Sequence, residues 1–377
     1  MHPDNPFRPG SGKPPHLAGR KDELDAMMGL VNAALAGKPR HQDGAIYGPR
    51  GCGKTALLHT IKDRIPDIAR HVLLTPSDLK NEDDVEAQIL KSLGARALSR
   101  LLPEETEINV QVLRGVWKRQ GIEFSDKRGE IAAHTKKHPF ILLLDEAHKL
   151  PLNVYEKLVH ESLALRAVGA CVTFILAGKP QLTSMGTRAG VSFSERFLHQ
   201  DIGLLSQEST SEALVVPFGR EGIGISGAVL QALFEDTHGY AYYVQLWGEG
   251  LWEFCREHSL RHIDVQAVDS IQPSVRRERE RAYQERYSAW TGEDLHLFER
   301  INQQLRAMDG LPSKRRLEQM IETELKAQRR TPHSFSDIYH KMVESDYVWQ
   351  RIGNRSVTFC IPSFSDLIEA NRSGVAA

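Results

Sequence analysis

The stretch Gly48-Pro49-Arg50-Gly51-Cys52-Gly53-Lys54-Thr55 decides the fold. It matches the pattern GxxxxGK[ST] at every defined position, which is the pattern of a phosphate-binding loop, or P-loop. Glycines let such a loop curl closely around an anion, and successive backbone N–H groups then point inward. We expect Lys54 to reach the β- and γ-phosphates and the Thr55 hydroxyl to bind Mg²⁺. The sequence therefore predicts a site for ATP and Mg²⁺.

The residues on both sides of this loop predict its setting. Residues 45–47 form a short apolar stretch that is typical of a strand, and residues 54–65 have the pattern of a helix. A helix that begins at Lys54 directs its N-terminal dipole at the phosphates. A glycine-rich turn with a surface lysine would not explain this strand–loop–helix order. The predicted nucleotide contacts are Gly48, Arg50, Gly51, Cys52, Gly53, Lys54, Thr55 and Ala56.

A second element follows at residues 140–146. Residues 140–144 form a continuous apolar run, as expected for a strand buried on both faces, and Asp145 and Glu146 follow it. We expect Asp145 to hold Mg²⁺ and Glu146 to orient the attacking water. Residues 145–148 also spell the box of a helicase superfamily, but the helical remainder is too small for a second motor domain.

The rest of the chain predicts an α/β core followed by helices. Apolar runs at 71–75, 171–176 and, more weakly, 202–205 alternate with helical patterns at 21–38, 83–93 and 152–166. This alternation predicts a parallel sheet. From about residue 207 the patterns are helical, including a charged helix at 275–290.

Composition excludes several function classes. The 377-residue chain has a net charge of −1, so its overall charge gives no argument for nucleic acid. No apolar run approaches the roughly 18 residues that span a bilayer, and no signal-peptide pattern opens the chain. We therefore expect a cytoplasmic protein with no membrane partner. The four cysteines are scattered and support neither disulfides nor a zinc site.

The motifs together resemble those of the AAA+ ATPases and, more narrowly, those of the bacterial "ATP-binding protein" group near the origin-recognition and STAND-type branches. Residues 14–20 resemble the family's segment before the first helix, which implies that Arg20 flanks the adenine; a solvated arginine is the alternative. Residues 193–197 resemble the segment that carries an arginine finger, which implies that Arg196 acts on a neighbouring subunit's phosphates. A structural ion pair is the alternative for Arg196.

Two departures from the family pattern concern its phosphate sensors. The segment 171–180 resembles the strand that ends in a polar γ-phosphate sensor, but here the end is Ala177-Gly178-Lys179. Lys179 as a substitute sensor and a plain turn before Pro180 both remain open. The segment 239–248 resembles the family's lid helix, without the arginine that many lids use as a second sensor. The resemblance then implies a slow switch rather than a fast motor.

The last stretch resembles a winged-helix domain, a common AAA+ appendage. A third helix around Phe335, Ile338 and Met342 would be the recognition helix, and a hairpin at Gly353-Asn354 would be the wing. The residues proposed to meet DNA phosphates are Arg315, Arg316, Arg351 and Arg355. Nearby acidic residues dilute this charge, so a protein-binding surface is the alternative.

We predict a P-loop NTPase with a parallel β-sheet core, a helical lid and a C-terminal winged helix. The expected segments are an extended arm (1–18), the ATPase core (19–206, with a hairpin insertion at 101–125), the lid (207–270), a linker helix (271–291) and the winged helix (292–377). The function predicted is a Mg²⁺-dependent, ATP-hydrolysing switch that forms homo-oligomers and regulates a DNA or effector-protein partner, in a DNA transaction or a defence-type process. Its catalytic residues would be Glu146, Lys54 and Arg196. The alternative is a STAND-like signalling scaffold with little turnover and a protein-binding winged helix.

Overall fold

The computed structural model describes residues 4–10, 13–93, 118, 120–190, 193–308, 310–328, 335–351 and 356–372. The chain divides into two compact units. The α/β unit comprises Arg20–Gly48 and Lys54–Ile202, and the helical unit comprises Met1–Gly19, Pro49–Gly53 and Gly203–Ala377. The predicted insertion at 101–125 lies largely outside the described residues.

The α/β unit is built on a parallel sheet with the strand order β2-β3-β4-β1-β5. The strands are β1 (Asp43–Tyr47), β2 (Arg70–Leu74), β3 (Phe140–Leu144), β4 (Val172–Gly178) and β5 (Phe197–Asp201). The three central strands, β3, β4 and β1, are buried along their whole length, which explains why β3 is apolar throughout and why the other two are largely apolar. Because the strands are parallel, the loops after β1, β4 and β3 emerge at one edge of the sheet, where α/β proteins bind ligands.

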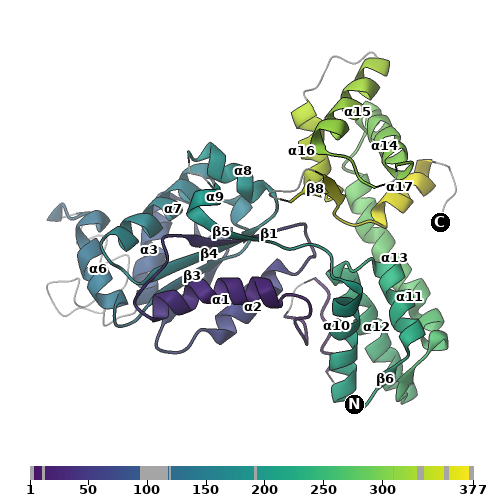
Figure 1. Cartoon of the computed structure of the whole chain (residues 1–377), viewed down its shortest axis with the longest axis horizontal. Helices are drawn as coiled ribbons and strands as arrows, with labels where there is room; N and C mark the ends of the chain where they lie inside the picture. Colours follow the sequence, from purple (N-terminus) through teal and green to yellow (C-terminus); the bar gives the residue numbers. More distant parts are fainter. Residues whose placement is uncertain are drawn as a thin grey trace. The chain divides into compact units, whose positions relative to one another are not determined.

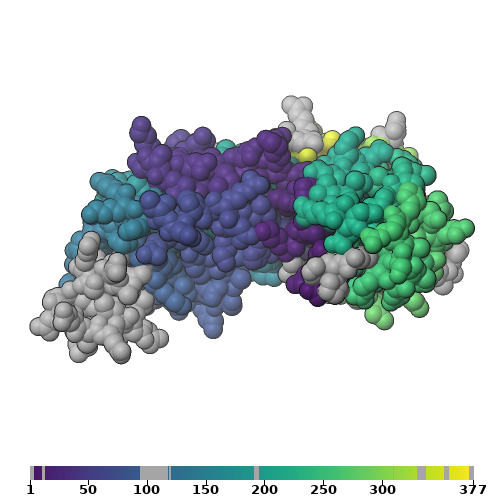
Figure 2. All heavy atoms as spheres, turned by 90° about the horizontal axis from the view of Figure 1, so that it is seen from below, coloured from purple at the N-terminus to yellow at the C-terminus, as the bar shows by residue number. Residues whose placement is uncertain are grey.

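Helices cover both faces of this sheet (Figure 1). On one face lie α1 (Lys21–Leu35) and α2 (Lys54–Arg64). The other face carries α3 (Glu82–Leu93), α7 (Leu152–Ala167) and α8 (Gln181–Arg188), while α6 (Arg128–Thr135) packs against α7. Figure 2 shows the α1 side of the unit, with α1 in purple. The short α9 (Phe193–Arg196) leads directly into β5.

The predicted parallel α/β core is confirmed, but one strand was predicted at the wrong place. The weak apolar run at 202–205 is not a strand, and the edge strand β5 occupies Phe197–Asp201 instead. As an edge strand it pairs with β1 and is half-buried over most of its length. It therefore carries polar residues and lacks the apolar run that marks the central strands.

The first part of the helical unit contains α10 (Gln207–Arg220), α11 (Gly227–Thr237), α12 (Ala241–His258) and α13 (Val265–Tyr287). Two short parallel strands, β6 (Gly224–Ile225) and β7 (His262–Ile263), join its loops. The charged helix predicted at 275–290 is the later part of the longer α13. The N-terminal arm packs here, because the ring of Phe7 is buried against Phe218 and Trp252, with centroids 5.3 and 6.1 Å away.

The last part of the helical unit has the order of a winged helix. Its helices are α14 (Gly292–Arg306), α15 (Lys314–Ala327) and α16 (Phe335–Glu344), followed by β8 (Val348–Gln350), β9 (Val357–Phe359) and α17 (Phe364–Arg372). Strands β8 and β9 are antiparallel, and an isolated bridge joins Ser313 to Ser356. The predicted wing turn at 353–354, and Arg355 with it, lie outside the described residues.

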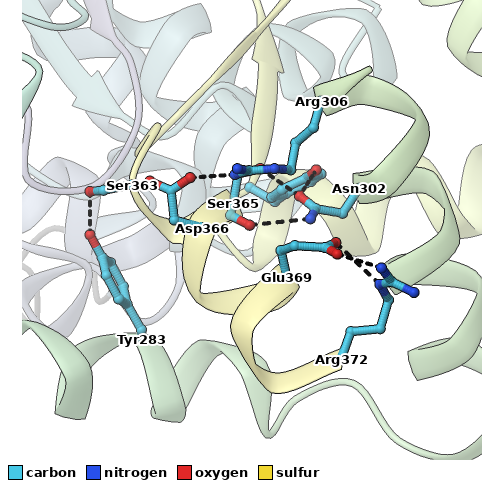
Figure 3. A network of polar contacts seen from close by, with 9 residues as sticks. Tyr283, Asn302, Arg306, Ser363, Ser365, Asp366, Glu369 and Arg372 are labelled. Atoms are coloured by element: carbon cyan, nitrogen blue, oxygen red, sulfur yellow. Dashed lines mark hydrogen bonds and ion pairs between the residues drawn. The ribbon is translucent and has the colours of Figure 1, made fainter. Parts of the chain in front are cut away.

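A polar network ties the ends of this region together (Figure 3). Asn302 on α14 is fully buried, and its Oδ1 accepts hydrogen bonds from the Tyr347 hydroxyl and the Ser365 hydroxyl, both at 2.7 Å. The Tyr283 hydroxyl of α13 lies 2.5 Å from the hydroxyl oxygen of Ser363. These bonds connect α13, α14 and the start of α17, and they satisfy polar groups that would be costly to bury unpaired.

In the part of the chain that the structure describes, none of the helices combines the length and the apolar character of a membrane span.

Candidate nucleotide site

The P-loop follows the carboxyl end of β1 and leads into α2, as its sequence predicts. Gly51 and Gly53 have φ angles of +79° and +97°, a region that favours glycine. Gly48 is required for a different reason: a Cβ atom there would lie 2.0 Å from the carbonyl oxygen of Ile202. The backbone conformation of the loop therefore favours glycine at Gly51 and Gly53, and the close approach of Ile202 requires it at Gly48.

The two polar residues at the start of α2 are held within the α/β unit. The Lys54 ammonium is buried, and its Nζ donates to the carbonyl oxygen of Gly48 at 2.9 Å. The hydroxyl of Thr55 donates to Oδ2 of Asp145 at 2.5 Å. The sequence predicted that Thr55 and Asp145 share a function, and the sheet order brings them together across β4.

The carboxylates after β3 have distinct surroundings. Asp145 is buried, and its Oδ1 accepts the backbone N–H of Glu146 at 2.8 Å. Glu146 adopts a left-handed backbone conformation with φ +52°. Its carboxylate lies 2.5 Å from the Nζ of Lys149. Burial by itself would raise the pKa of Glu146, but the hydrogen bond from Lys149 and nearby positive charge, including Lys54, outweigh it and lower this pKa.

His148 lies beside these carboxylates on the 3₁₀ turn η3 (Ala147–Lys149). Its Nδ1 accepts the backbone N–H of Lys179 at 3.2 Å, and its Nε2 is 4.0 Å from Oε2 of Glu146. Burial, together with the charges of Lys54, Lys179 and Lys149, outweighs the attraction of Glu146 and lowers the pKa of His148 to about 4. The ring is therefore neutral at pH 7.

The residues at this edge fit a magnesium nucleotide. Thr55 and Asp145 offer a hydroxyl and a carboxylate oxygen within 2.5 Å of each other, and hard oxygen ligands are those that Mg²⁺ takes. Lys54, buried beside the loop, offers positive charge to phosphates.

The other predicted site residues are placed as follows. Arg20 is buried, directly precedes α1, and its Nη1 lies 3.6 Å from Oε1 of Glu23. Ala56 is buried in α2. Arg196 is exposed and directly precedes β5, next to the start of β1. It lines an open cavity of about 590 Å³ together with Arg40 and His41, at the sheet edge opposite to the one that carries the P-loop.

Within the helical unit, the middle of the P-loop contacts the start of α12 and the turn between α16 and β8. The Tyr240 hydroxyl donates to the carbonyl oxygen of Arg50 at 2.9 Å, and the backbone N–H of Tyr242 donates to the carbonyl oxygen of Gly51 at 3.1 Å. The backbone N–H of Arg50 lies 3.5 Å from Oδ1 of Asp346. Cys52 is fully buried. The sequence did not predict these contacts, because their partners lie about 190 to 300 residues away.

Comparison with known proteins agrees with this geometry. Residues 40–185 match the family model of the AAA domain. Among solved structures, the chain is similar to Cdc6p from Pyrobaculum aerophilum, with 16% identity, a TM-score of 0.50, and 98% of this chain and 96% of that chain covered. The chain carries an AAA+ ATPase fold.

Two further solved structures are similar to the chain over nearly its whole length. A Walker-type ATPase of Pyrococcus abyssi is 12% identical, with a TM-score of 0.57 and coverage of 96% of this chain and 98% of that chain. The ORC2 protein of Aeropyrum pernix, described as ADPNP–ADP complexes, is 14% identical, with a TM-score of 0.56 and coverage of 97% of each chain. A comparison with curated proteins found no match.

The AAA domain match includes part of the predicted site. The P-loop, Asp145, Glu146 and Lys179 lie within the matched residues, whereas Arg20 and Arg196 lie outside them.

Proposed function

We propose that this chain binds ATP with Mg²⁺ and hydrolyses it to ADP and phosphate as a slow switch. The observation that carries the proposal is the 2.5 Å contact between the Thr55 hydroxyl and the Asp145 carboxylate, with Glu146 as the next residue. A P-loop threonine joined to a carboxylate that follows another strand of the same parallel sheet is an arrangement suited to phosphoryl transfer.

Each residue has a separate task in this proposal. Lys54 exchanges the carbonyl of Gly48 for phosphate oxygens, and the loop amides bind the remaining phosphate charge. Thr55 and Asp145 would hold Mg²⁺, which neutralises charge that develops on the phosphates. Glu146 accepts a hydrogen bond from the attacking water and orients it. Its lowered pKa keeps it ionised at neutral pH, as this task needs.

The switch would operate through the contacts of the loop within the helical unit. Tyr240 and Tyr242 bond to the carbonyl groups of Arg50 and Gly51. A phosphate bound by the loop amides would change the position of these carbonyls and so bias the start of α12. The nucleotide can shift the equilibrium between two conformations only to the extent that it binds one of them more tightly than the other.

We propose that the switch is a homo-oligomer in which Arg196 acts on the nucleotide of a neighbour. Arg196 lies by the start of β1, whereas the P-loop follows the end of β1. The five residues of this strand span about 16 Å, so Arg196 cannot reach its own P-loop. The exposed guanidinium, with Arg40 and His41 nearby, suits an anionic group brought by another subunit. An ion pair of Arg196 within its own chain is the alternative.

DNA is the partner that we propose, through the winged helix. Lys314, Arg315 and Arg316 are exposed side by side at the start of α15, where they can meet phosphates. A different observation favours a protein partner: the exposed side chains described on α16 are Asp337, His340 and Glu344, and the two acidic residues would repel DNA.

Nucleotide binding is tested with the variant Lys54→Ala. The loss of the ammonium should abolish ATP binding in a fluorescent-nucleotide titration. Lys62→Ala, in the last turn of the same helix, is the matched control and should bind as the wild type does. Unchanged affinity in Lys54→Ala would refute the assignment of the loop.

The partner is tested with the double variant Arg315→Ala/Arg316→Ala. If DNA is the partner, the slope of log K against log salt should decrease by about 2, since each phosphate contact contributes about 0.9. Arg276→Ala/Arg277→Ala on the exposed face of α13 is the control. An absence of salt-dependent DNA binding in the wild type would favour the protein-binding alternative.

A further inference from the structure

His148 has no task in the function proposed above, although both of its ring nitrogens face the site. Nδ1 accepts the backbone N–H of Lys179 at the end of β4, at 3.2 Å. Nε2 lies 4.0 Å from Oε2 of Glu146. The side chain is only 9% exposed, so its position is fixed by packing. His148 therefore connects the carboxyl end of β4 with the carboxylate proposed to orient water.

The hydrogen bond at Nδ1 determines where the ring carries its proton. In a neutral imidazole one nitrogen is a donor and the other an acceptor. Because Nδ1 of His148 accepts from Lys179, Nε2 carries the hydrogen on the side of Glu146. The separation of 4.0 Å exceeds a hydrogen bond by about 1 Å. In this arrangement the carboxylate of Glu146 is bonded to Lys149 instead.

Gly178, the last residue of β4, leaves space for the His148 ring because it has no side chain. A Cβ atom at Gly178 would lie 3.2 Å from both the backbone nitrogen and Nδ1 of His148. Such a contact is tight, so a larger residue at position 178 would displace the turn that carries His148. The lack of a side chain at Gly178 and the ring of His148 are thus complementary.

We propose that His148 is a positioning residue for Glu146. When ATP occupies the loop, Nε2–H donates to the Glu146 carboxylate and draws it away from Lys149 toward the attacking water. Because Nδ1 of His148 is bonded to the end of β4, this movement depends on the position of that strand end. The AAA+ resemblance predicts a polar side chain there, but the chain has Ala177 and Gly178. This inference rests on the proposed ATP hydrolysis.

Three variants distinguish the roles of the two ring nitrogens of His148. His148→Leu removes both functions, His148→Asn keeps an acceptor near Nδ1, and His148→Gln places an amide N–H near Nε2. In single-turnover assays the Leu and Asn variants should hydrolyse ATP about tenfold more slowly, with nucleotide Kd unchanged, because a misplaced carboxylate lowers the rate and not the affinity. The Gln variant should recover most of the rate. His160→Leu, an exposed histidine on α7, is the control.

Equal rates of single-turnover ATP hydrolysis in the wild type and His148→Leu would overturn the proposal. It would also be overturned if His148→Leu weakened nucleotide binding without slowing hydrolysis. A second readout does not need turnover: ¹⁵N NMR of the His148 ring with ADPNP and Mg²⁺. The Nε2–H resonance should move downfield on binding in the wild type, and this movement should be absent in Glu146→Ala. If the wild type does not hydrolyse ATP, the proposed function fails. The NMR measurement then decides the role of His148 separately. If the Nε2–H resonance does not move when ADPNP and Mg²⁺ bind, the positioning role of His148 is wrong.

Discussion

Replacement of Lys149 by alanine tests the electrostatics of Glu146 directly. The Lys149 ammonium lies 2.5 Å from the Glu146 carboxylate and favours its ionised form. Burial raises the pKa of Glu146, and the removal of Lys149 takes away a hydrogen bond and a positive charge that lower it, while the charge of Lys54 remains. The pKa of Glu146 must therefore rise in Lys149→Ala.

The size of the rise follows from the exposure of the pair. The side chains of Lys149 and Glu146 are 60% and 36% exposed, so solvent screens their attraction. Exposed ion pairs contribute about 0.2 to 1 kcal/mol. The ionised form of Glu146 should therefore lose about 0.2 to 1 kcal/mol of stabilisation in Lys149→Ala, which raises its pKa slightly. The carboxylate would then be protonated over a wider acidic range than in the wild type.

The assay is a ¹³C NMR titration of the glutamate carboxyl resonances in protein free of nucleotide and Mg²⁺. The Glu146 signal is assigned by its absence from Glu146→Gln. Lys127→Ala is the matched control, since Lys127 makes a similar ion pair with Glu130, three residues on, at 2.8 Å. A Glu146 pKa that falls or stays constant in Lys149→Ala would refute the account of this contact.

Two further predictions concern stability. Asn302→Leu leaves the buried hydroxyl groups of Tyr347 and Ser365 without their acceptor, so the free energy of unfolding in urea should decrease by about 2 to 5 kcal/mol; an unchanged value would contradict the role of this network. Phe7→Ala empties the space beside Phe218 and should cost about 3 kcal/mol by the same measurement. A transition that matches the wild type would show that the N-terminal arm does not stabilise the helical unit.

The sequence predicted the strands and the helix that carry the P-loop and Asp145 because their signals are local. The loop from Gly48 to Thr55 needs a strand before it and a helix after it, and each is visible within a few residues. The apolar run at 140–144 matches β3 residue for residue, since a strand buried on both faces must be apolar throughout. These two elements fix the α/β core, because together they imply a parallel sheet.

Features that depend on distant contacts could not be predicted in this way. Strand β5 was missed because an edge strand needs no apolar run. The burial of Phe7 and the bond from Tyr240 to the loop each need a partner far away in the chain. His148 did carry a local signal, two residues after Glu146, but only its contact with the end of β4 distinguishes it from a surface histidine.

The role proposed for Glu146 is to orient water for hydrolysis at a nucleotide site formed by the P-loop, Thr55 and Asp145. It is tested most directly by ATP binding and single-turnover hydrolysis measured side by side for the wild type and Glu146→Gln. The variant keeps the shape of the side chain but loses its charge, so ATP should bind with similar affinity while hydrolysis slows by about 100-fold or more. Hydrolysis at the wild-type rate in Glu146→Gln would contradict the account.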